Sequence, residues 1–296
     1  MRGGSLSQPF PAIAPLHRDY RAPALEIRGR RFSWGERTFL MGIVNVTPDS
    51  FSGDGTGADP AAAAALAARF EAEGADILDV GGESTRPGAS PLDPEVELAR
   101  VVPAIRAVRA RTSLPVSVDT CHPAVAAAAI AAGADVVNDI WGLRSDAAMA
   151  ETVARAGVPL VAMHNQRGRA PGDVIQGLRA GFTETLRLAA EAGIPSERVI
   201  LDPGFGFGWE PAQNLEMVRR LPELWDFAMP LLVGPSRKST IGLVLEAPVG
   251  ERLEGTGAAV ALAIAGGADI VRVHDVRQVA RVARVADAIV RDNWRP

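Results

Sequence analysis

Three polar residues of this sequence suit the recognition of a flat heterocycle. Asp119, Asn138 and Asp202 each stand at the end of a short apolar run. A carboxylate accepts two hydrogen bonds and an amide both donates and accepts, so together they match a ring edge with several N–H donors. Two other interpretations stay open: three buried helix caps, or a carboxylate-rich metal site, which the basic residues nearby disfavour.

A basic set follows other runs of the same kind and suits an anionic ligand. It comprises Arg86, Lys238, Arg272 and His274. Arg272 and His274 alternate along one run, so their side chains point to the same side of a strand. Bidentate arginine bonds favour phosphate or carboxylate groups, and the alternative for Arg272 is a structural ion pair with Asp275.

Lys238 is the only lysine among the 31 lysines and arginines of the chain. Its ammonium is a compact point charge on a flexible stem, whereas the guanidinium is a planar fork. A single lysine in so arginine-rich a sequence indicates a place where a guanidinium does not serve, unless it stands there by chance.

These residues need a fold that gathers the ends of many strands. From Met41 onward, a short apolar run, a polar or glycine-rich turn and an alanine-rich helical segment alternate. Near-continuous apolar runs are typical of parallel strands buried on both faces. Eight such repeats predict a (β/α)₈ TIM barrel, in which functional groups lie at the carboxyl ends of the strands; a doubly wound open sheet is the alternative.

The predicted strands are Met41–Val46, Asp76–Val80, Pro115–Val118, Val136–Asn138, Val158–Met163, Val199–Leu201, Pro230–Val233 and Asp269–Val273. The predicted helices are Pro60–Glu73, Pro94–Arg111, Pro123–Ala132, Asp146–Ala156, Val174–Ala192, Ala212–Leu221, Thr256–Ala265 and Val276–Arg291.

The segment before Met41 is expected to lie outside the barrel wall. Residues 1–24 are predicted to form an N-terminal extension. Residues 25–40 are predicted to form a β-hairpin that caps the bottom of the barrel, with Leu25–Phe32 and Arg37–Leu40 flanking the turn Ser33–Glu36. Residues 41–296 are predicted to form the barrel, so that 25–296 is a single domain.

Composition excludes several classes of protein. A net charge of −4 on 296 residues, with the charges dispersed, disfavours a nucleic-acid partner. The single cysteine, Cys121, excludes an intrachain disulfide framework and is expected to be a buried, unreactive thiol. No apolar stretch reaches the roughly 18 residues of a membrane span, and Met1–Tyr20 lacks the apolar centre of a secretory signal. We therefore expect a cytoplasmic protein without a membrane partner.

Seven strings, in this order along the chain, resemble the dihydropteroate synthase family. They are Met41-Gly-Ile-Val-Asn-Val-Thr-Pro-Asp-Ser-Phe-Ser52, Asp79-Val-Gly-Gly-Glu-Ser-Thr-Arg-Pro-Gly88, Ser117-Val-Asp-Thr120, Val137-Asn-Asp139, Leu201-Asp-Pro-Gly-Phe-Gly-Phe-Gly208, Ser236-Arg-Lys-Ser239 and Arg272-Val-His-Asp275. The resemblance runs from about Leu25 to the C-terminus. It implies a TIM barrel that condenses 6-hydroxymethyl-7,8-dihydropterin diphosphate with p-aminobenzoate, giving 7,8-dihydropteroate and diphosphate.

The resemblance also implies a role for each matching residue. The pterin edge corresponds to Asp119, Asn138 and Asp202, with Lys238 beside the pterin carbonyl and the second substrate. The diphosphate ligands correspond to Arg272 and His274, and the magnesium-associated residue to Asn45, so Mg²⁺ is the implied cofactor. The residues that the resemblance implies to be catalytic are Lys238, Arg272 and His274, with Asp49 in a first loop and Arg86 in a second. The remaining substrate-binding matches are Met163, Phe207 and Ser239, with Phe51 in the first loop and Thr85 and Pro87 in the second.

Two features depart from the family pattern. Trp209 replaces a lysine that is common after the glycine-rich run, which places a bulky ring near the expected pterin mouth, and the loop Ser52–Gly57 has one extra glycine. Two alternatives remain: a pterin methyltransferase, which has no use for a diphosphate site, and a pterin-binding paralogue without catalysis. The family usually forms homodimers, and the apolar stripe Val279, Val282, Val285, Ala286 and Ile289 is compatible with that.

Overall fold

Within the described residues, eight parallel strands form a barrel, as the alternation of apolar runs predicts. The computed structural model describes residues 22–47, 56–57, 59–83, 92–169 and 172–294. The strands are β3 (Phe39–Asn45), β4 (Ile77–Gly81), β5 (Val116–Asp119), β6 (Val136–Asp139), β7 (Leu160–Met163), β8 (Val199–Asp202), β9 (Leu232–Val233) and β10 (Ile270–Val273). Each begins within two residues of its predicted run.

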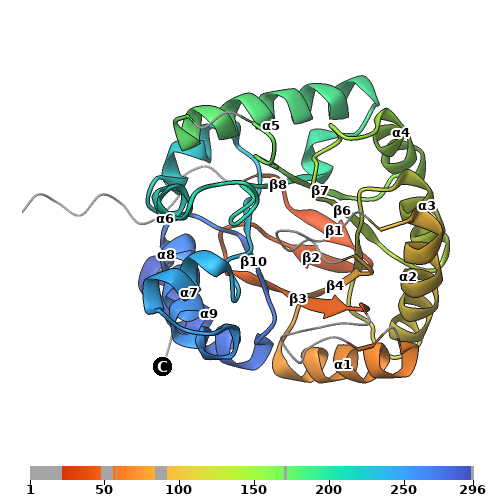
Figure 1. The fold of residues 1–296 in the computed structure, drawn as a ribbon, viewed down its shortest axis with the longest axis horizontal. Helices are drawn as coiled ribbons and strands as arrows, with labels where there is room; N and C mark the ends of the chain where they lie inside the picture. The colour runs from red at the N-terminus through yellow and green to blue at the C-terminus, as the bar shows by residue number, and fades with distance from the viewer. Residues whose placement is uncertain (1–21, 48–55, 58, 84–91, 170–171, 295–296) are drawn as a thin grey trace, which may run out of the picture.

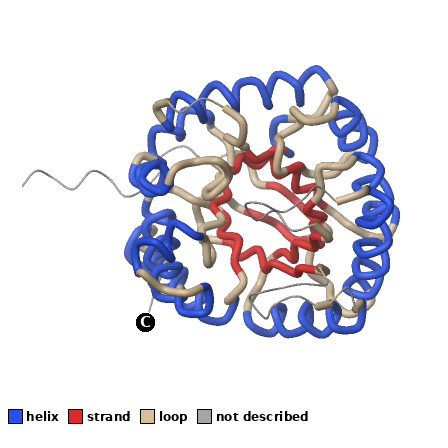
Figure 2. The backbone as a smooth tube through the Cα atoms, viewed as in Figure 1, coloured by secondary structure: helices blue, strands red, loops and turns tan. Residues whose placement is uncertain are grey.

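The order of the strands closes the sheet on itself. Neighbours follow the order β8-β7-β6-β5-β4-β3-β10-β9, and a parallel bridge between Leu201 and Leu231 joins the two ends. The open-sheet alternative is therefore wrong. Figure 2 shows the strands as an inner ring enclosed by helices.

The helices form the outer layer and are those predicted, with one addition. They are α1 (Pro60–Glu73), α2 (Pro94–Arg109), α3 (Pro123–Ala131), α4 (Ala147–Ala156), α5 (Val174–Glu191), α6 (Pro211–Arg219), α7 (Ser239–Leu245), α8 (Leu253–Ala265) and α9 (Val276–Val290). Helix α7 was not predicted, because it has only seven residues and its apolar residues Leu243, Val244 and Leu245 are exposed instead of forming a buried stripe. None of the described helices is both long and apolar enough to cross a membrane.

The N-terminal hairpin is present, but the prediction of its second strand was wrong. β1 (Leu25–Ile27) pairs antiparallel with β2 (Arg30–Phe32), so the turn is Arg28–Gly29. Phe39 and Leu40, predicted for the second arm, belong to the barrel strand β3.

Apolar side chains of the N-terminal segment close the bottom of the barrel. Leu25, Ile27, Phe32 and Trp34 form one buried cluster with residues of the barrel strands, among them Ile77 of β4, near its amino end. The prediction that this segment caps the N-terminal face is confirmed, and Figure 1 shows β1 and β2 within the ring of helices.

Three aspartates, each at the start of a strand, hold this lower face together. They end the repeated phrase Gly-Ala-Asp at Asp76, Asp135 and Asp269. Asp76 forms two hydrogen bonds with Arg37, of 2.9 and 2.6 Å, and Asp269 accepts from the amide of Gly35 at 3.1 Å.

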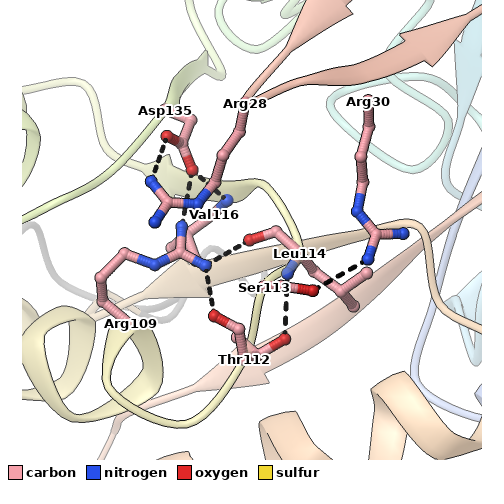
Figure 3. Close-up of polar contacts among 8 residues, drawn as sticks. All are labelled: Arg28, Arg30, Arg109, Thr112, Ser113, Leu114, Val116 and Asp135. Atoms are coloured by element: carbon pink, nitrogen blue, oxygen red, sulfur yellow. Dashed lines mark hydrogen bonds and ion pairs between the residues drawn. The ribbon is translucent and has the colours of Figure 1, made fainter.

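Asp135 likewise connects the hairpin to the barrel, and it contacts three different segments. It pairs with Arg109 of α2 at 2.7 Å and with Arg28 of the hairpin turn at 3.5 Å, and it accepts from the amide of Val116 at 2.9 Å. Figure 3 shows these contacts joining hairpin, helix and strand. The repeated aspartates are thus part of the scaffold, at the opposite end from the pocket described next.

Candidate active site

The predicted polar residues meet in one pocket at the carboxyl ends of the strands. Its charged and amide residues come from five loops or strand ends, namely Asp119, Asn138, Asp202, Lys238 and Arg272. The side chains of Met163 and Phe207 contribute apolar walls. Ile140, Phe205 and Gly234 also line the pocket and were not among the predicted site residues. The convergence of polar groups from separate strands excludes the interpretation that they are unrelated helix caps.

Arg272 crosses the floor of this pocket and binds two carboxylates. Its Nε lies 2.6 Å from Asp79 Oδ2, and its Nη2 lies 2.7 Å from Asp119 Oδ2. Strands β3 and β4 lie between β10 and β5 in the barrel, so the side chain spans the interior. The remaining cavity is about 20 Å³, room for about one water molecule. A flat ring therefore needs more room than the pocket offers in this structure.

The alternative pairing of Arg272 with Asp275 is wrong. Asp275 instead binds Arg237, whose Nε and Nη2 donate to the two carboxylate oxygens at 2.9 and 2.6 Å. Arg237 has a φ of +55°, a left-handed conformation that costs a non-glycine residue free energy. The bidentate ion pair offsets that cost and fixes the backbone directly before Lys238.

Asp79 is a site residue that the sequence analysis missed. Its side chain is fully buried and accepts from Asn138 Nδ2 at 3.0 Å as well as from Arg272. The sequence does contain a signal for it, namely a charged residue inside the apolar strand β4. A carboxylate buried there needs cationic or hydrogen-bonding partners. Because Asp79 takes an amide hydrogen of Asn138, it orients that amide.

The electrostatics of the pocket follow from burial. Burial raises the pKa of Asp119 to about 7, against the opposing effect of Arg272, and raises the pKa of Asp202 to about 6. Burial and repulsion from Arg272 lower the pKa of Lys238 to about 8, although Asp202 and Asp119 oppose the change. Asp119, Asp202 and Lys238 therefore change charge between about pH 6 and 8. A ligand that prefers one protonation state readily changes the charge of such groups.

Lys238 extends over an aromatic ring. Its Nζ lies 4.0 Å from the centroid of Phe207, a cation–π distance. Its stem passes Gly206 so closely that a Cβ built there would lie 2.9 Å from Lys238 Cδ. The ammonium therefore lies over Phe207, and Asp202 and Asp119 act on it electrostatically.

Two further predicted residues, His274 and Ser239, follow strands β10 and β9 in the sequence. His274 Nδ1 is 3.0 Å from Ser236 Oγ, which also accepts from the His274 amide at 3.2 Å. Ser239 is the first residue of α7 and is exposed. Neither lines the pocket itself.

The other predicted residues are Asn45, the last residue of β3, and five residues that follow β3 or β4 in the sequence. Asn45 ends β3, is partly buried, and accepts from the Thr56 amide at 3.0 Å through its backbone carbonyl. The residues that lie outside the described part of the chain are Asp49, Phe51, Thr85, Arg86 and Pro87.

Trp209 does not stand at the mouth of the pocket, so that expectation was wrong. The indole is buried, stacks on His164 with 5.5 Å between ring centroids, and donates from Nε1 to the carbonyl of Pro203 at 3.2 Å. It belongs to the buried core, where its ring lies against Gly177 of α5.

Gly204 is required for this turn, and replacing it tests how rigid the turn is. Gly204 has a φ of +72°, and an added Cβ would lie 2.0 Å from the backbone oxygen of His164. Left-handed strain costs about 1–2 kcal/mol, and forcing atoms into packed space costs about 1–3 kcal/mol more. We expect Gly204→Ala to lower the free energy of unfolding by about 3 kcal/mol.

Gly193→Ala is the matched control. Gly193 also has a positive φ, +82°, but nothing lies within 4 Å of an added Cβ, so only the strain applies. Denaturant unfolding measures both variants. Equal losses of stability would show that the turn after β8 adapts and that the clash is unimportant.

Comparisons with known proteins agree with this architecture. Residues 41–274 match the model of a family described as pterin binding enzymes. The chain is 44% identical over 268 residues to a dihydropteroate synthase of Clostridium beijerinckii, covering 90% of this chain and 100% of that protein. It is 45% identical over 286 residues to one of Synechocystis, covering 94% and 97%.

Solved structures give the same result. A dihydropteroate synthase of Yersinia pestis, in complex with a sulfonamide drug, is 37% identical with a TM-score of 0.86, covering 91% of this chain and 100% of that one. A dihydropteroate synthase of Xanthomonas albilineans with 4-aminobenzoic acid is 43% identical with a TM-score of 0.83, covering 90% and 98%.

Proposed function

The chain belongs to the pterin-binding enzymes, among their dihydropteroate synthases, and from this membership we propose how its residues perform the reaction. The enzyme condenses 6-hydroxymethyl-7,8-dihydropterin diphosphate with p-aminobenzoate to form 7,8-dihydropteroate and diphosphate. One observation supports the assignment of the pocket above all: two carboxylates, an amide, a lysine and an arginine converge where the barrel strands end.

The pterin is proposed to bind against Asp119, Asn138 and Asp202. Ionised carboxylates accept hydrogen bonds from ring and exocyclic N–H groups, and the Asn138 amide, oriented by Asp79 at 3.0 Å, offers both an acceptor and a donor. Entry of the ring requires Arg272 to leave Asp119. The N–H groups of the pterin then replace the guanidinium on that carboxylate, while Asp79 is still available to Arg272.

The freed Arg272 is proposed to act with His274 on the diphosphate. The C–O bond between the pterin methylene and the diphosphate breaks first, and positive groups stabilise the negative charge that develops on the leaving oxygen. The electron-rich dihydropterin stabilises the cationic methylene. Ser236, 3.0 Å from His274 Nδ1, fixes the orientation of the imidazole for this contact.

The amine of p-aminobenzoate then attacks the methylene and forms the C–N bond, and its extra proton passes to the released diphosphate or to water. An aromatic amine is neutral at pH 7, so no strong general base is needed. Phe207 is proposed as a wall of this second subsite and Ser239, at the start of α7, as a contact for its carboxylate. Lys238, whose Nζ lies 4.0 Å from the Phe207 ring, stands between the two substrates.

Mg²⁺ is the proposed cofactor, and Asn45 is the described residue that would hold it. The amide oxygen of Asn45 is a hard ligand at the partly buried end of β3. Mg²⁺ prefers such oxygens, keeps several waters and commonly binds substrate phosphates together with few protein ligands, so a single amide fits it. When bound, the ion supplies charge neutralisation for the diphosphate.

Diphosphate release tests this function directly. The pterin diphosphate substrate is incubated with and without p-aminobenzoate, and diphosphate and dihydropteroate are measured together. We expect equal amounts of both products, with dihydropteroate strictly dependent on p-aminobenzoate, and loss of both in Lys238→Ala. Absence of both products would favour a pterin-binding paralogue, and methyl transfer to a corrinoid acceptor without diphosphate release would favour a methyltransferase.

Pterin binding is expected to strengthen as the pH rises. The pKa values of Asp119 and Asp202, about 7 and about 6, are both raised by burial, and hydrogen bonds from the pterin favour the ionised forms. Binding should therefore release protons, and affinity should fall as the pH drops through 7 and then 6. Calorimetry in buffers of different ionisation enthalpy measures this release.

The stability of the ligand-free protein depends on pH in the opposite direction from pterin affinity. A carboxylate whose folded pKa lies above its unfolded value costs stability at high pH, and that cost disappears as the pH falls from about 7 toward 4. The ligand-free protein therefore gains stability from Asp119 over this range. Proton uptake on binding, or affinity independent of pH, would contradict the assignment of the two aspartates.

We also propose a homodimer through the helices near the C-terminus. The predicted stripe on α9 is divided: Val279 and Ala286 are buried against the barrel, whereas Val285 and Ile289 are 62% and 70% exposed. Exposed leucines on α7 and α8 add apolar surface, including Leu262 at 63%. Sedimentation equilibrium should give twice the 31.1 kDa chain mass, and Leu262→Glu should shift it toward the monomer; a wild-type monomer would contradict the proposal.

A further inference from the structure

A second cluster of ligand-type side chains lies beside the pocket. Its members are Glu83, Cys121 and His122, whose carboxylate oxygen, Sγ and imidazole nitrogen lie within 4.8 Å of one another. All three side chains are partly buried. The reaction proposed above gives none of them a role, and the residues that line the pterin pocket do not include them.

Adjacent strands bring the cluster together. Glu83 follows β4, whereas Cys121 and His122 lie between β5 and α3, and β4 pairs with β5 in parallel. The hydroxyl of Thr120 accepts from the His122 amide at 3.1 Å and fixes the turn. His122 is the N-cap residue of α3, but its side chain makes no capping hydrogen bond. The imidazole is thus directed elsewhere.

A buried carboxylate orients that imidazole. Glu97 of α2 is fully buried, its Oε2 lies 2.7 Å from His122 Nδ1, and its Oε1 has no hydrogen-bond partner in the described part of the chain. An ionised carboxylate only accepts, so Nδ1 carries the proton and Nε2 holds the lone pair. Histidines that ligate metals are commonly held in this way by a carboxylate behind them.

The local charge favours a cation. Among the described residues, neither Glu83 nor Glu97 forms an ion pair with an arginine or lysine. The carboxylates of Glu83 and Asp139 both act electrostatically on the Cys121 thiol. This negative surrounding is favourable for a cation, and a thiol that coordinates a metal ion is deprotonated.

We propose that Glu83, Cys121 and His122 bind one Zn²⁺ ion, with Glu97 orienting His122 and a water molecule in the fourth position. One thiolate, one imidazole and one carboxylate form a donor set typical of Zn²⁺ and unsuited to Mg²⁺. With metal–ligand bonds of about 2.0–2.3 Å, tetrahedral ligands lie about 3.3–3.8 Å apart. Since the three groups lie within 4.8 Å of one another, they need to approach by about 1.5 Å at most, which side-chain rotation supplies.

Metal binding by the whole, substrate-free protein tests this proposal without reference to catalysis. Protein treated with a chelator is titrated with Zn²⁺ by calorimetry, and with Co²⁺ as a spectroscopic probe. We expect one Zn²⁺ per chain, not displaced by excess Mg²⁺, and a thiolate-to-cobalt charge-transfer band in the near ultraviolet. Cys121→Ser should remove the band, and His122→Ala should abolish tight binding.

Glu97 and Glu95 give a matched pair on α2. Glu97→Gln keeps the shape of the side chain behind His122, and loss of such a partner typically lowers metal affinity about 10- to 100-fold. Glu95→Gln changes an exposed carboxylate two residues away and should leave affinity unchanged. Circular dichroism confirms that each variant is folded. Absence of the charge-transfer band in the wild type, or equal Zn²⁺ affinity in Cys121→Ser, would overturn the proposal.

Discussion

Replacing Lys238 by arginine is expected to lower kcat/KM by about 100-fold while the barrel stays folded. The substitution keeps a positive charge at the site and changes its shape. A displacement of about 1 Å in a catalytic arrangement costs about 100-fold in rate. Steady-state kinetics with both substrates, together with circular dichroism, measure the effect.

The geometry around Lys238 is the reason that we do not expect a guanidinium to replace its ammonium. The stem passes directly over Gly206, and Nζ lies 4.0 Å from the centroid of Phe207. The cavity beside it is only about 20 Å³, so a planar fork has to move the ring or occupy substrate space. Burial also lowers the pKa of Lys238 to about 8, whereas an arginine there stays charged throughout the physiological range.

Two further variants separate charge from shape. Lys238→Ala removes both, and Arg219→Lys makes an arginine–lysine exchange at an exposed position of α6. We expect Lys238→Arg to be nearly as impaired as Lys238→Ala, and Arg219→Lys to be as active as the wild type. Near-normal activity of Lys238→Arg would show that only charge matters, and that the single lysine is a matter of chance.

Replacing Asp79 by asparagine is expected to reduce both stability and pterin binding. Asp79 is fully buried, pairs with Arg272 at 2.6 Å and accepts from Asn138 at 3.0 Å. Breaking a buried ion pair costs about 3–5 kcal/mol. Since Arg272 keeps its contact with Asp119 at 2.7 Å, we expect a loss near 3 kcal/mol, measured by denaturant unfolding.

The effect on binding follows from the same contacts. The Asp79→Asn substitution introduces an amide that has to reorient to accept from Asn138. A misaligned buried hydrogen-bonding group costs about 1–3 kcal/mol, which corresponds to about 5- to 150-fold in pterin affinity. Calorimetry with a pterin ligand measures this change. If Asp79 only supports the fold, stability will fall while the pterin affinity of the folded protein stays the same.

An exposed ion pair provides the control for Asp79. Asp226 contacts Arg179 at 2.8 Å, and both side chains are substantially exposed. Pairs of this kind contribute about 0–1 kcal/mol, so Asp226→Asn should change stability little and pterin binding not at all. A loss as large as that of Asp79→Asn would mean that removing any carboxylate has this effect.

The sequence by itself determined the barrel and most of the residues of its pocket. Parallel strands buried on both faces require near-continuous apolar runs, so the eight strands were visible from the pattern of apolar residues alone. Polar residues that end such runs must gather at one rim when the sheet closes. For this reason the sequence alone places Asp119, Asn138, Asp202, Lys238 and Arg272 together.

Only the tertiary structure decided which of these residues contact one another. Arg272 pairs with Asp79 and Asp119 across the barrel, and Asp275 pairs with Arg237, because closing the sheet sets distances that linear spacing does not contain. The hairpin's pairing and helix α7 also depend on contacts with distant residues instead of a local periodic pattern. Trp209 turns into the core for the same reason: its neighbour His164 comes from the segment after β7. Packing between distant segments, not position in a motif, decides where a ring lies.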